Sequence, residues 1–432
     1  MVFYFVCFVY FVGKLLFYKS VSCVSFNLNR RICYSIRNFY EIYSIQLFMK
    51  AIRQNENLRL PRRLRDVQPT LIRQIFERAL PDSINFGLGE PDLPTPRFLR
   101  EEAARVTLNE QNGYTNHAGL LPLREKIAAS YPHLNLNADQ VCVTVGSQEA
   151  MTAAFLAMVD DGDEVLIPNP SFPAYENCVK ISGGTPVFYR LPAEKDFGFD
   201  IEEFKSKITE KTKVAVVISP SNPTGKIFTP EDLRQISEAL KDTGIYLISD
   251  EIYSDLYFTN DAPRSASEFY DKTVIVSGLS KSLSMTGWRV GWAASSQSDV
   301  IKATLVLHGF LTVCTSTISQ KASLLGWTEE AENAKREARE VYKKRGEFLI
   351  GILDKELGLR GTHPEGAFYT MVDVRHLGDD IEIAEKFLQN RVITVPGIAF
   401  GTEAKGFLRV SFCNPEERMA EGVRRMKEAL EK

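Results

Sequence analysis

A short stretch of the sequence joins a residue that could attack a carbonyl group to residues that could bind an anion. It runs Ser277-Gly-Leu-Ser-Lys-Ser-Leu-Ser-Met-Thr-Gly-Trp-Arg289 and follows the β-branched run Thr273–Val276, which predicts a buried strand. Lys281 therefore follows a strand end, the place where open α/β sheets bind ligands. A partly desolvated lysine can lose its proton and form a Schiff base, while Ser280 and Arg289 offer donors to an anion such as phosphate. Taken alone, the stretch would also fit a solvent-exposed Ser-rich loop.

Two further motifs follow predicted strands and could hold other parts of a ligand. Thr144-Val-Gly-Ser-Gln-Glu-Ala150 follows one strand and opens a helix, so its backbone N–H groups and the Ser147 hydroxyl make a phosphate site. Simple N-capping by Ser147 would explain it as well. It matches neither the dinucleotide fingerprint nor the P-loop, which disfavours NAD and ATP. Asn169-Pro-Ser-Phe-Pro-Ala-Tyr175 follows the next strand, and Phe172, if it is not simply a core residue, could stack on a flat ring.

Two more motifs place an amide, a carboxylate and a phenol at strand ends. Ser219-Pro-Ser-Asn-Pro-Thr-Gly225 would hold the Asn222 amide rigidly, although a tight turn alone would explain its prolines and glycine. Ile248-Ser-Asp-Glu-Ile-Tyr253 ends an apolar strand with Asp250, which could pair with a cation or cap a helix. Tyr253 could direct its hydroxyl to the same side.

These residue types together predict a particular kind of cofactor. A reactive amine, an anion site, a stacking ring, an amide, a carboxylate and a phenol would bind a flat, phosphorylated, pyridine-like aldehyde. Pyridoxal 5′-phosphate is such a molecule, and it serves as an electron sink when a carboxylate keeps its ring nitrogen protonated. Asp250 is the predicted carboxylate.

The elements that must position these motifs alternate between apolar strands and amphipathic helices. This order predicts a mainly parallel α/β sheet covered on both faces. The seven strand candidates are Val141–Val145, Glu164–Ile167, Pro186–Tyr189, Val214–Ile218, Ile245–Ser249, Thr273–Val276 and Val290–Ala293.

The C-terminal part of the sequence predicts a smaller α+β domain. A long charged helix is expected over Trp327–Leu353, with Ala331, Ala338, Val341, Phe348 and Ile352 on one face, then short strands around Ala367–Val374 and Phe407–Phe412 and a terminal helix. Near the other end we expect a helix over Leu71–Ala79 and, because of its glycines and prolines, a loop without regular structure over Ile84–Pro96. We expect residues 49–94 and 326–432 to form this domain, and residues 95–325 to form the large ligand-binding domain.

Composition excludes several other functions. The net charge is −3 without a long basic run, so nucleic acid is an unexpected partner. The seven cysteines form no C-x-x-C pair and the five histidines are scattered, so we expect no metal, no disulfide framework and a reducing, cytoplasmic location.

Residues 1–48 differ from the rest of the sequence. They are rich in Phe and Tyr, and Val2–Gly13 carries no charge, but this run is shorter than the roughly 20 residues of a membrane-spanning helix. Its positive charges follow the apolar run, unlike those of a secretory signal. We expect a non-catalytic extension, from a mis-set translation start before Met49 or, as the weaker alternative, a marginal membrane anchor.

The motifs also carry a family resemblance over residues of about 60 to 430. The sequence resembles the class I/II pyridoxal-phosphate aminotransferases of fold type I, and within them the prokaryotic aspartate and aromatic branch. The residues that carry the resemblance are Gly89-Glu-Pro-Asp92, Tyr114, Gly146-Ser-Gln148, Asn169–Phe172, Asn222–Gly225, Ser249–Tyr253, Ser280-Lys281, Met285–Arg289 and Arg409.

The resemblance implies a role for each matching residue. Lys281 would form the internal aldimine and shuttle a proton, Asp250 would pair with the ring nitrogen, and Asn222 and Tyr253 would bind the ring 3-oxygen. Phe172 would stack on the ring in place of a more common Trp. Gly89 would let the backbone approach the substrate, and Arg409 would bind its α-carboxylate. The phosphate would be held by Gly146, Ser147, Gln148, Ser280 and Arg289, with Tyr114 reaching in from the other subunit of a homodimer.

The implied reaction moves an amino group from an L-amino acid to a 2-oxo acid such as 2-oxoglutarate, by way of pyridoxamine phosphate. Aspartate is the leading donor and aromatic amino acids follow; alanine and kynurenine stay open, and His117, His308 and Phe400 are candidates to sort the side chain. A C–S lyase on the same fold is the alternative function, and a cofactor-sensing regulator would need a DNA-binding module that residues 1–48 do not resemble. Gly278 replaces a phosphate-binding Ser or Thr of many relatives, so one phosphate contact is expected to be absent.

Overall fold

A computed structural model describes residues 70–432 together with Leu64 and Val67. These described residues belong to one compact unit, Pro61–Lys432. The predicted extension over residues 1–48 and the beginning of the predicted small domain lie outside the described residues.

The large sheet has seven strands, and all seven predicted strands are confirmed. Strands β7, β6, β5, β3 and β4 pair with one another in parallel, whereas β8 is antiparallel to both of its neighbours, β2 and β7. The sheet is therefore mainly parallel, as expected. Its order is β2 (Val141–Thr144), β8 (Gly291–Ala294), β7 (Thr273–Gly278), β6 (Tyr246–Asp250), β5 (Thr212–Ile218), β3 (Glu164–Asn169) and β4 (Thr185–Arg190).

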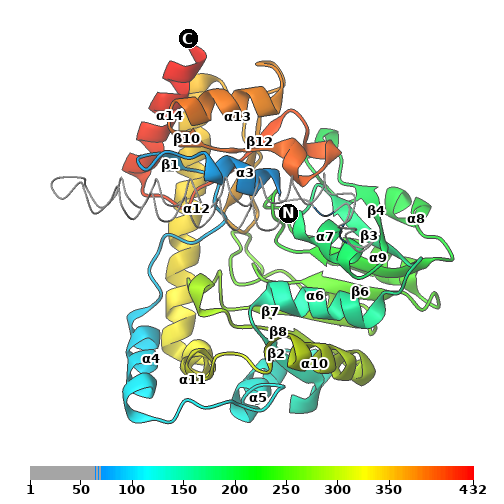
Figure 1. Cartoon of the computed structure of the whole chain (residues 1–432). Helices are drawn as coiled ribbons and strands as arrows, with labels where there is room; N and C mark the ends of the chain where they lie inside the picture. Colours follow the sequence, from blue (N-terminus) through cyan, green and yellow to red (C-terminus); the bar gives the residue numbers. More distant parts are fainter. Residues whose placement is uncertain (1–63, 65–66, 68–69) are drawn as a thin grey trace, which may run out of the picture. The chain divides into compact units, whose positions relative to one another are not determined.

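Helices bury both faces of this sheet, which explains why its strands are apolar without alternation. On β5, Val214, Val216 and Ile218 pack in one cluster with α6 and α7, whereas Ala215 and Val217 pack in another with α8 and α9 (Figure 1). The helices of this part are α4 (Arg97–Asn109), α5 (Leu121–Ala129), α6 (Ser147–Met158), α7 (Ala174–Ile181), α8 (Ile201–Ser206), α9 (Pro230–Leu240), α10 (Ser298–Thr312) and α11 (Thr317–Ser323).

A smaller α+β part is built from both ends of the described chain. Its antiparallel sheet has the order β11 (Val395–Pro396), β12 (Phe407–Ser411) and β9 (Tyr369–Asp373). The short strand β1 (Ile84–Asn85) pairs in parallel with β10 (Val392–Ile393), so the expectation of no regular structure from Ile84 onward is wrong for its first two residues. The helices here are α3 (Leu71–Glu77), α13 (Asp380–Gln389) and α14 (Glu416–Leu430).

The predicted long helix is confirmed as α12 (Glu329–Leu357). Of its predicted inner face, Ala331 and Ala338 are buried, and Phe348 and Ile352 are partly buried against the core. Val341 is only half-buried, while its neighbour Tyr342 is buried, as is Leu349. Thr328 caps the first turn by accepting the Ala331 N–H, and Gly358 ends the helix in the left-handed conformation (φ 65°).

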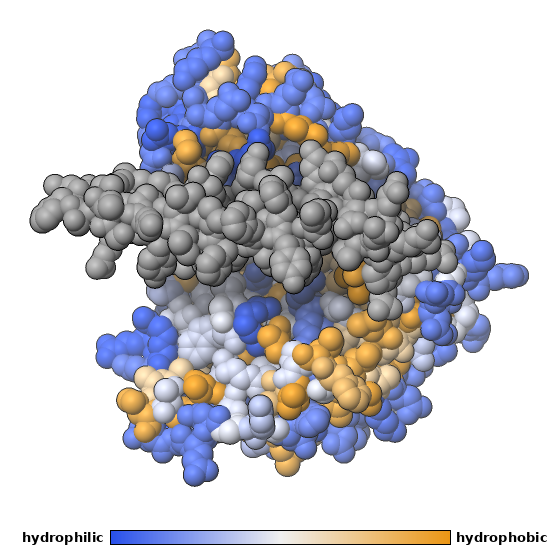
Figure 2. Space-filling model, in the orientation of Figure 1, coloured by the Kyte–Doolittle hydropathy of each residue, from blue (hydrophilic) through white to orange (hydrophobic). Residues whose placement is uncertain are grey.

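The surface over α10 carries an apolar patch. Val306, Phe310, Leu311 and Val313 are 59%, 88%, 54% and 42% exposed, and Figure 2 shows apolar side chains at the surface in this region. Contiguous exposed apolar groups on a folded unit mark an interaction surface. Among residues 70–432, no helix has the length and apolar composition needed to cross a membrane.

Candidate active site

Several of the predicted site residues gather at the carboxyl edge of the large sheet. Asp250 is the last residue of β6, and Lys281 follows the end of β7 by three residues. The Ser219–Gly225 loop follows β5, and Gly146 follows β2 as the N-cap of α6. Parallel neighbours end at the same sheet edge, so motifs far apart in the sequence meet there.

Lys281 is half-buried and its amine is held by a backbone acceptor. The Nζ donates to the Gly89 carbonyl oxygen at 2.8 Å, so the loop before α4 orients it. Burial lowers the pKa of Lys281 to about 8, and the nearby positive charges of Arg289 and Arg409 act in the same direction. The amine is therefore partly neutral near pH 7–8, the state in which it is a nucleophile and a base.

Asp250 is buried, and two donors hold its carboxylate. Tyr175 Oη donates to Oδ2 at 2.7 Å, and the Ile252 N–H donates to Oδ1 at 3.1 Å. Burial raises the pKa of Asp250 to about 6, although both hydrogen bonds and the charge of Lys281 lower it. A cationic partner stabilises a buried carboxylate of this kind, because it offsets the cost of removing the negative charge from water.

Asn222 and Arg409 form the second part of the site. Arg409 Nη1 donates to Asn222 Oδ1 at 3.1 Å, and Nη2 donates to the Gly87 carbonyl oxygen. The guanidinium carbon lies 4.6 Å from the ring centroids of both Tyr369 and Phe400. Arg409 Nε is buried without a hydrogen-bond partner among the described residues. A buried guanidinium with an unused donor is suited to a carboxylate.

Two tyrosine hydroxyl groups meet beside this arginine. Tyr253 Oη and Tyr369 Oη are 2.8 Å apart, and burial raises the pKa of both phenols, that of Tyr369 to about 12. Any Cβ on Gly89 would collide with the Tyr369 hydroxyl. Glycine is therefore required for this close approach of the loop to the site.

Arg289 and the start of α6 form the anion end of the site. Arg289, in the left-handed conformation, donates through Nη1 to the Thr286 carbonyl oxygen at 2.9 Å and through Nη2 to that of Val145 at 3.2 Å. Its guanidinium lies so close to Gly146 that a Cβ there would collide with it. Ser147 is the first residue of α6, whose N–H groups favour an anion.

Three other positions bear on the predicted phosphate contacts: Ser280, Gln148 and Gly278. Ser280 is buried next to Lys281, whereas the Gln148 side chain turns to Cys178 and donates to its Sγ at 3.7 Å. At Gly278, a Cβ would lie 2.8 Å from the Val290 carbonyl oxygen, so a Ser or Thr does not fit this backbone. The absence of a side chain at Gly278 is thus explained by the close pairing of β7 and β8.

The remaining predicted residues lie around this centre. Phe172 is half-buried and packs edge-to-face on Tyr175, with ring centroids 5.8 Å apart, which puts it next to the partner of Asp250. Tyr114 is 87% exposed, and the described residues do not bring it into the site. His308 is buried against Glu149, with its Nδ1 2.8 Å from Oε1, and His117 is exposed. Of the three residues predicted to sort the substrate side chain, Phe400 is the one that contacts Arg409.

Tyr175 and Tyr369 have no predicted role, although both contact site residues. Tyr175 closes the motif that begins at Asn169, so a signal existed: a phenol one helical turn after the stacking residue. Tyr369 lies on a strand of the smaller part, more than 100 residues from Tyr253, and no local signal marks it.

The chain is similar to known aminotransferases in both sequence and fold. The family model "Aminotransferase class I and II" matches residues 81–426. A probable aspartate aminotransferase of Methanocaldococcus jannaschii is 33% identical over 377 residues, which covers 85% of this chain and 99% of the relative. A probable aspartate/prephenate aminotransferase of Aquifex aeolicus is 37% identical over 368 residues, 81% of this chain and 91% of the relative. The solved structure of aspartate aminotransferase from Thermus thermophilus with maleate matches with a TM-score of 0.82 at 32% identity, covering 86% of this chain and 99% of that one.

Proposed function

The chain belongs to the class I and II aminotransferases, and we propose that it transfers the amino group of aspartate or an aromatic amino acid to a 2-oxo acid such as 2-oxoglutarate. The cofactor in this proposal is pyridoxal 5′-phosphate. The observation that carries it is the meeting of an amine of lowered pKa (Lys281), a buried carboxylate (Asp250) and a buried guanidinium (Arg409) at one sheet edge.

The residues fit this cofactor. Asp250 would hold its protonated ring nitrogen, Asn222 and Tyr253 its 3-oxygen, and Phe172 its ring face. The phosphate would be held by the N-terminus of α6, by Arg289 and by the other predicted contacts, Gly146, Ser147, Gln148 and Ser280. When bound, the cofactor supplies an electron sink for the pair left by the broken Cα–H bond.

The side chains of the protein would perform the proton chemistry and the positioning. Lys281 Nζ, oriented by the Gly89 carbonyl oxygen and partly neutral near pH 7–8, is the base for the Cα proton and later its acid. Arg409 would bind the α-carboxylate and so fix which Cα bond faces Lys281. Because Asn222 contacts Arg409, it would link substrate binding to the cofactor ring.

The donor is the finer part of the proposal. Aspartate is the first choice of donor, because this chain matches most of the length of relatives that are described as probable aspartate or aspartate/prephenate aminotransferases. Phe400 beside Arg409 offers an apolar surface that supports an aromatic donor as the second choice.

A homodimer in which Tyr114 serves the neighbouring site is also proposed. Tyr114 is 87% exposed in the isolated chain, and the apolar patch on α10 (Val306, Phe310, Leu311 and Val313) needs a partner. The described cysteines are free thiols, which supports the proposed cytoplasmic location. Mixed dimers of Lys281→Ala and Tyr114→Ala chains should regain activity that neither variant has alone; no regain would contradict action in trans.

A donor panel with 2-oxoglutarate as acceptor tests the reaction. Glutamate and the oxo acid of the donor should form in equal amounts, with aspartate the fastest donor. Lys281→Ala should lose turnover, and retained transamination in that variant would overturn the assignment. Formation of pyruvate and ammonia from cystathionine, without glutamate, would instead favour the lyase.

A further inference from the structure

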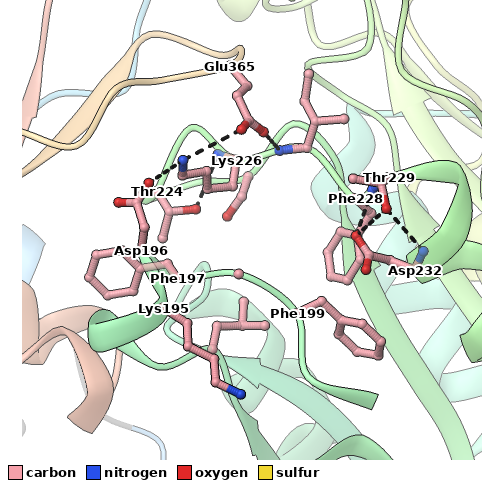
Figure 3. A pocket seen from close by; sticks show the side chains of 14 residues that line it. Lys195, Asp196, Phe197, Phe199, Thr224, Lys226, Phe228, Thr229, Asp232 and Glu365 are labelled. Carbon is pink, nitrogen blue, oxygen red and sulfur yellow. Dashed lines mark hydrogen bonds and ion pairs between the residues drawn. The ribbon is translucent and has the colours of Figure 1, made fainter.

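A cavity of about 250 Å³ lies beside the loop that carries Asn222, and the residues that line it include Ser221 and Thr224 but none of the predicted catalytic side chains (Figure 3). Pockets for drug-sized ligands measure roughly 300–1,000 Å³. This cavity therefore suits a small metabolite.

One side of the cavity is aromatic. Phe199 and Phe228 line this side, with their rings 5.5 Å apart at 55°, whereas Phe197 lies across the cavity beside Asp196. Phe197 and Phe228 are buried, while Phe199 is half-buried. The pair formed by Phe199 and Phe228 can accept one more flat ring in an edge or offset arrangement.

The opposite side is charged, with an excess of carboxylates. Lys226 Nζ lies 2.5 Å from Asp196 Oδ2 and 3.5 Å from Glu365 Oε1. Figure 3 shows these three side chains together, across the cavity from Phe199 and Phe228. The complete lining contains two lysines and three carboxylates, so it carries a net charge of −1 and complements a cation.

Ser221 adds a polar group that nothing in the described chain satisfies. It is 3% exposed and lines the cavity, and its Oγ has no hydrogen-bond partner among the described residues. A hydroxyl both donates and accepts, and buried hydroxyl groups normally find a partner. This orphaned atom is an independent sign that a ligand belongs here.

We propose that the cavity binds a small aromatic amine that carries a hydroxyl group. The ring lies against Phe199 and Phe228, the ammonium group meets Asp196 and Glu365 as a second cation beside Lys226, and the hydroxyl group meets Ser221. Neither an aliphatic amine nor an aromatic acid satisfies both sides of the cavity.

A ligand there contacts residues that hold the active-site loop. The Ser221 N–H donates to the Lys226 carbonyl oxygen at 2.8 Å, and the N–H groups of Glu365 and Gly366 both donate to the Gly225 carbonyl oxygen, at 2.8 and 2.9 Å. Binding at Ser221 and Glu365 therefore acts on the loop that carries Asn222. This effect on turnover rests on the proposed function, whereas the binding itself does not.

The test is calorimetric titration of the holoenzyme with tyramine, phenethylamine and 4-hydroxyphenylacetate. The holoenzyme is first reduced with borohydride, so that no aldehyde remains to react with an amine. Tyramine should bind best, about fivefold tighter than phenethylamine because of one extra hydrogen bond. The anion should bind more weakly than either amine.

Three variants separate the cavity from other sites. Ser221→Ala should abolish the preference for tyramine over phenethylamine, and Phe199→Ala should weaken both amines about tenfold. Phe188→Ala on β4 removes a partly exposed ring outside the cavity and is the matched control. The proposal would be overturned if Phe199→Ala and Phe188→Ala weakened amine binding equally, or if 4-hydroxyphenylacetate bound as tightly as tyramine. It would also be overturned if neither amine bound at millimolar concentration. If the amines bind but the enzyme fails to transaminate, the proposed function is wrong and the cavity assignment stands.

Discussion

Tyr175→Phe is the substitution that isolates the electrostatics of Asp250. It removes a phenol oxygen whose donor bond to Asp250 Oδ2 measures 2.7 Å, and it leaves the ring that packs on Phe172. Burial already raises the pKa of Asp250 to about 6, and the Tyr175 hydroxyl opposes that rise. Loss of the hydroxyl should therefore raise the pKa further.

The size of the effect follows from the strength of a hydrogen bond to a charged group, about 1.5–3 kcal/mol. At about 1.4 kcal/mol for each pKa unit, the pKa of Asp250 should move from about 6 to about 7–8. At pH 7 the ionised fraction then falls from roughly nine-tenths to between a half and a tenth. If only the ionised form binds the cofactor's protonated ring, the apparent cofactor affinity should fall about two- to tenfold.

The assay is a titration of apoenzyme with pyridoxal 5′-phosphate at several pH values. The Tyr175→Phe defect should be present at pH 7 and should largely disappear by pH 9, where Asp250 is ionised in both proteins. Tyr189→Phe is the control, because that buried hydroxyl donates to the Val216 carbonyl oxygen at 2.8 Å and not to Asp250. It should cost about 1 kcal/mol of stability without changing the pH dependence. A Tyr175→Phe defect that is absent at pH 7, or equal at all pH values, would refute the reasoning.

Three other substitutions have defined outcomes. Arg409→Lys should raise KM for the amino acid about ten- to a hundredfold with a smaller change in kcat, because lysine cannot offer a two-pronged donor; an unchanged KM in steady-state kinetics would contradict the role. Gly89→Ala should impair turnover more than stability, because its Cβ collides with the Tyr369 hydroxyl, and thermal unfolding of the same sample separates the two. Glu251→Gln should remove a decline in stability between pH 4.5 and 7: burial raises the pKa of Glu251 to about 7, so the folded state holds a proton that the unfolded state loses as pH rises. The difference should reach about 3 kcal/mol near pH 7 in denaturant titrations, and parallel curves for the two proteins would disprove it.

The large sheet could be predicted because its strands are marked by composition and its ends by turn residues. Val214–Ile218, for example, is an unbroken apolar run because both of its faces are buried, and the prolines of the next motif end it. The buried face of α12 could not be read in the same way. Lys335 is buried there through contacts with Glu332 and Asp255, and Gly346 makes room for Phe412. A charged and a small residue on the inner face interrupt the apolar pattern.

The site likewise has a part that the sequence predicts and a part that it does not. Lys281, Asp250 and Asn222 follow strands of one parallel sheet, so their meeting follows from local sequence and sheet geometry. The contacts made by Tyr369 depend on how the smaller part folds onto that edge. Arg409 and Asn222 are 187 positions apart, and their 3.1 Å hydrogen bond depends on the same docking. The hydrophobic periodicity of the sequence does not show how the smaller part packs onto the edge of the large sheet.

Burial has opposite effects on the two ionisable groups at the centre of the site, and both effects suit the proposed chemistry. It favours the neutral form of each, so it lowers the pKa of Lys281 to about 8 and raises that of Asp250 to about 6. For the lysine, the neutral form is the reactive one. For the aspartate, the neutral form would be the wrong one, so two hydrogen bonds counteract burial and keep the carboxylate mostly ionised at pH 7. The same dry environment can therefore serve both groups because Asp250 has donors such as Tyr175, whereas the one hydrogen-bond acceptor of Lys281 among the described residues is the Gly89 carbonyl oxygen.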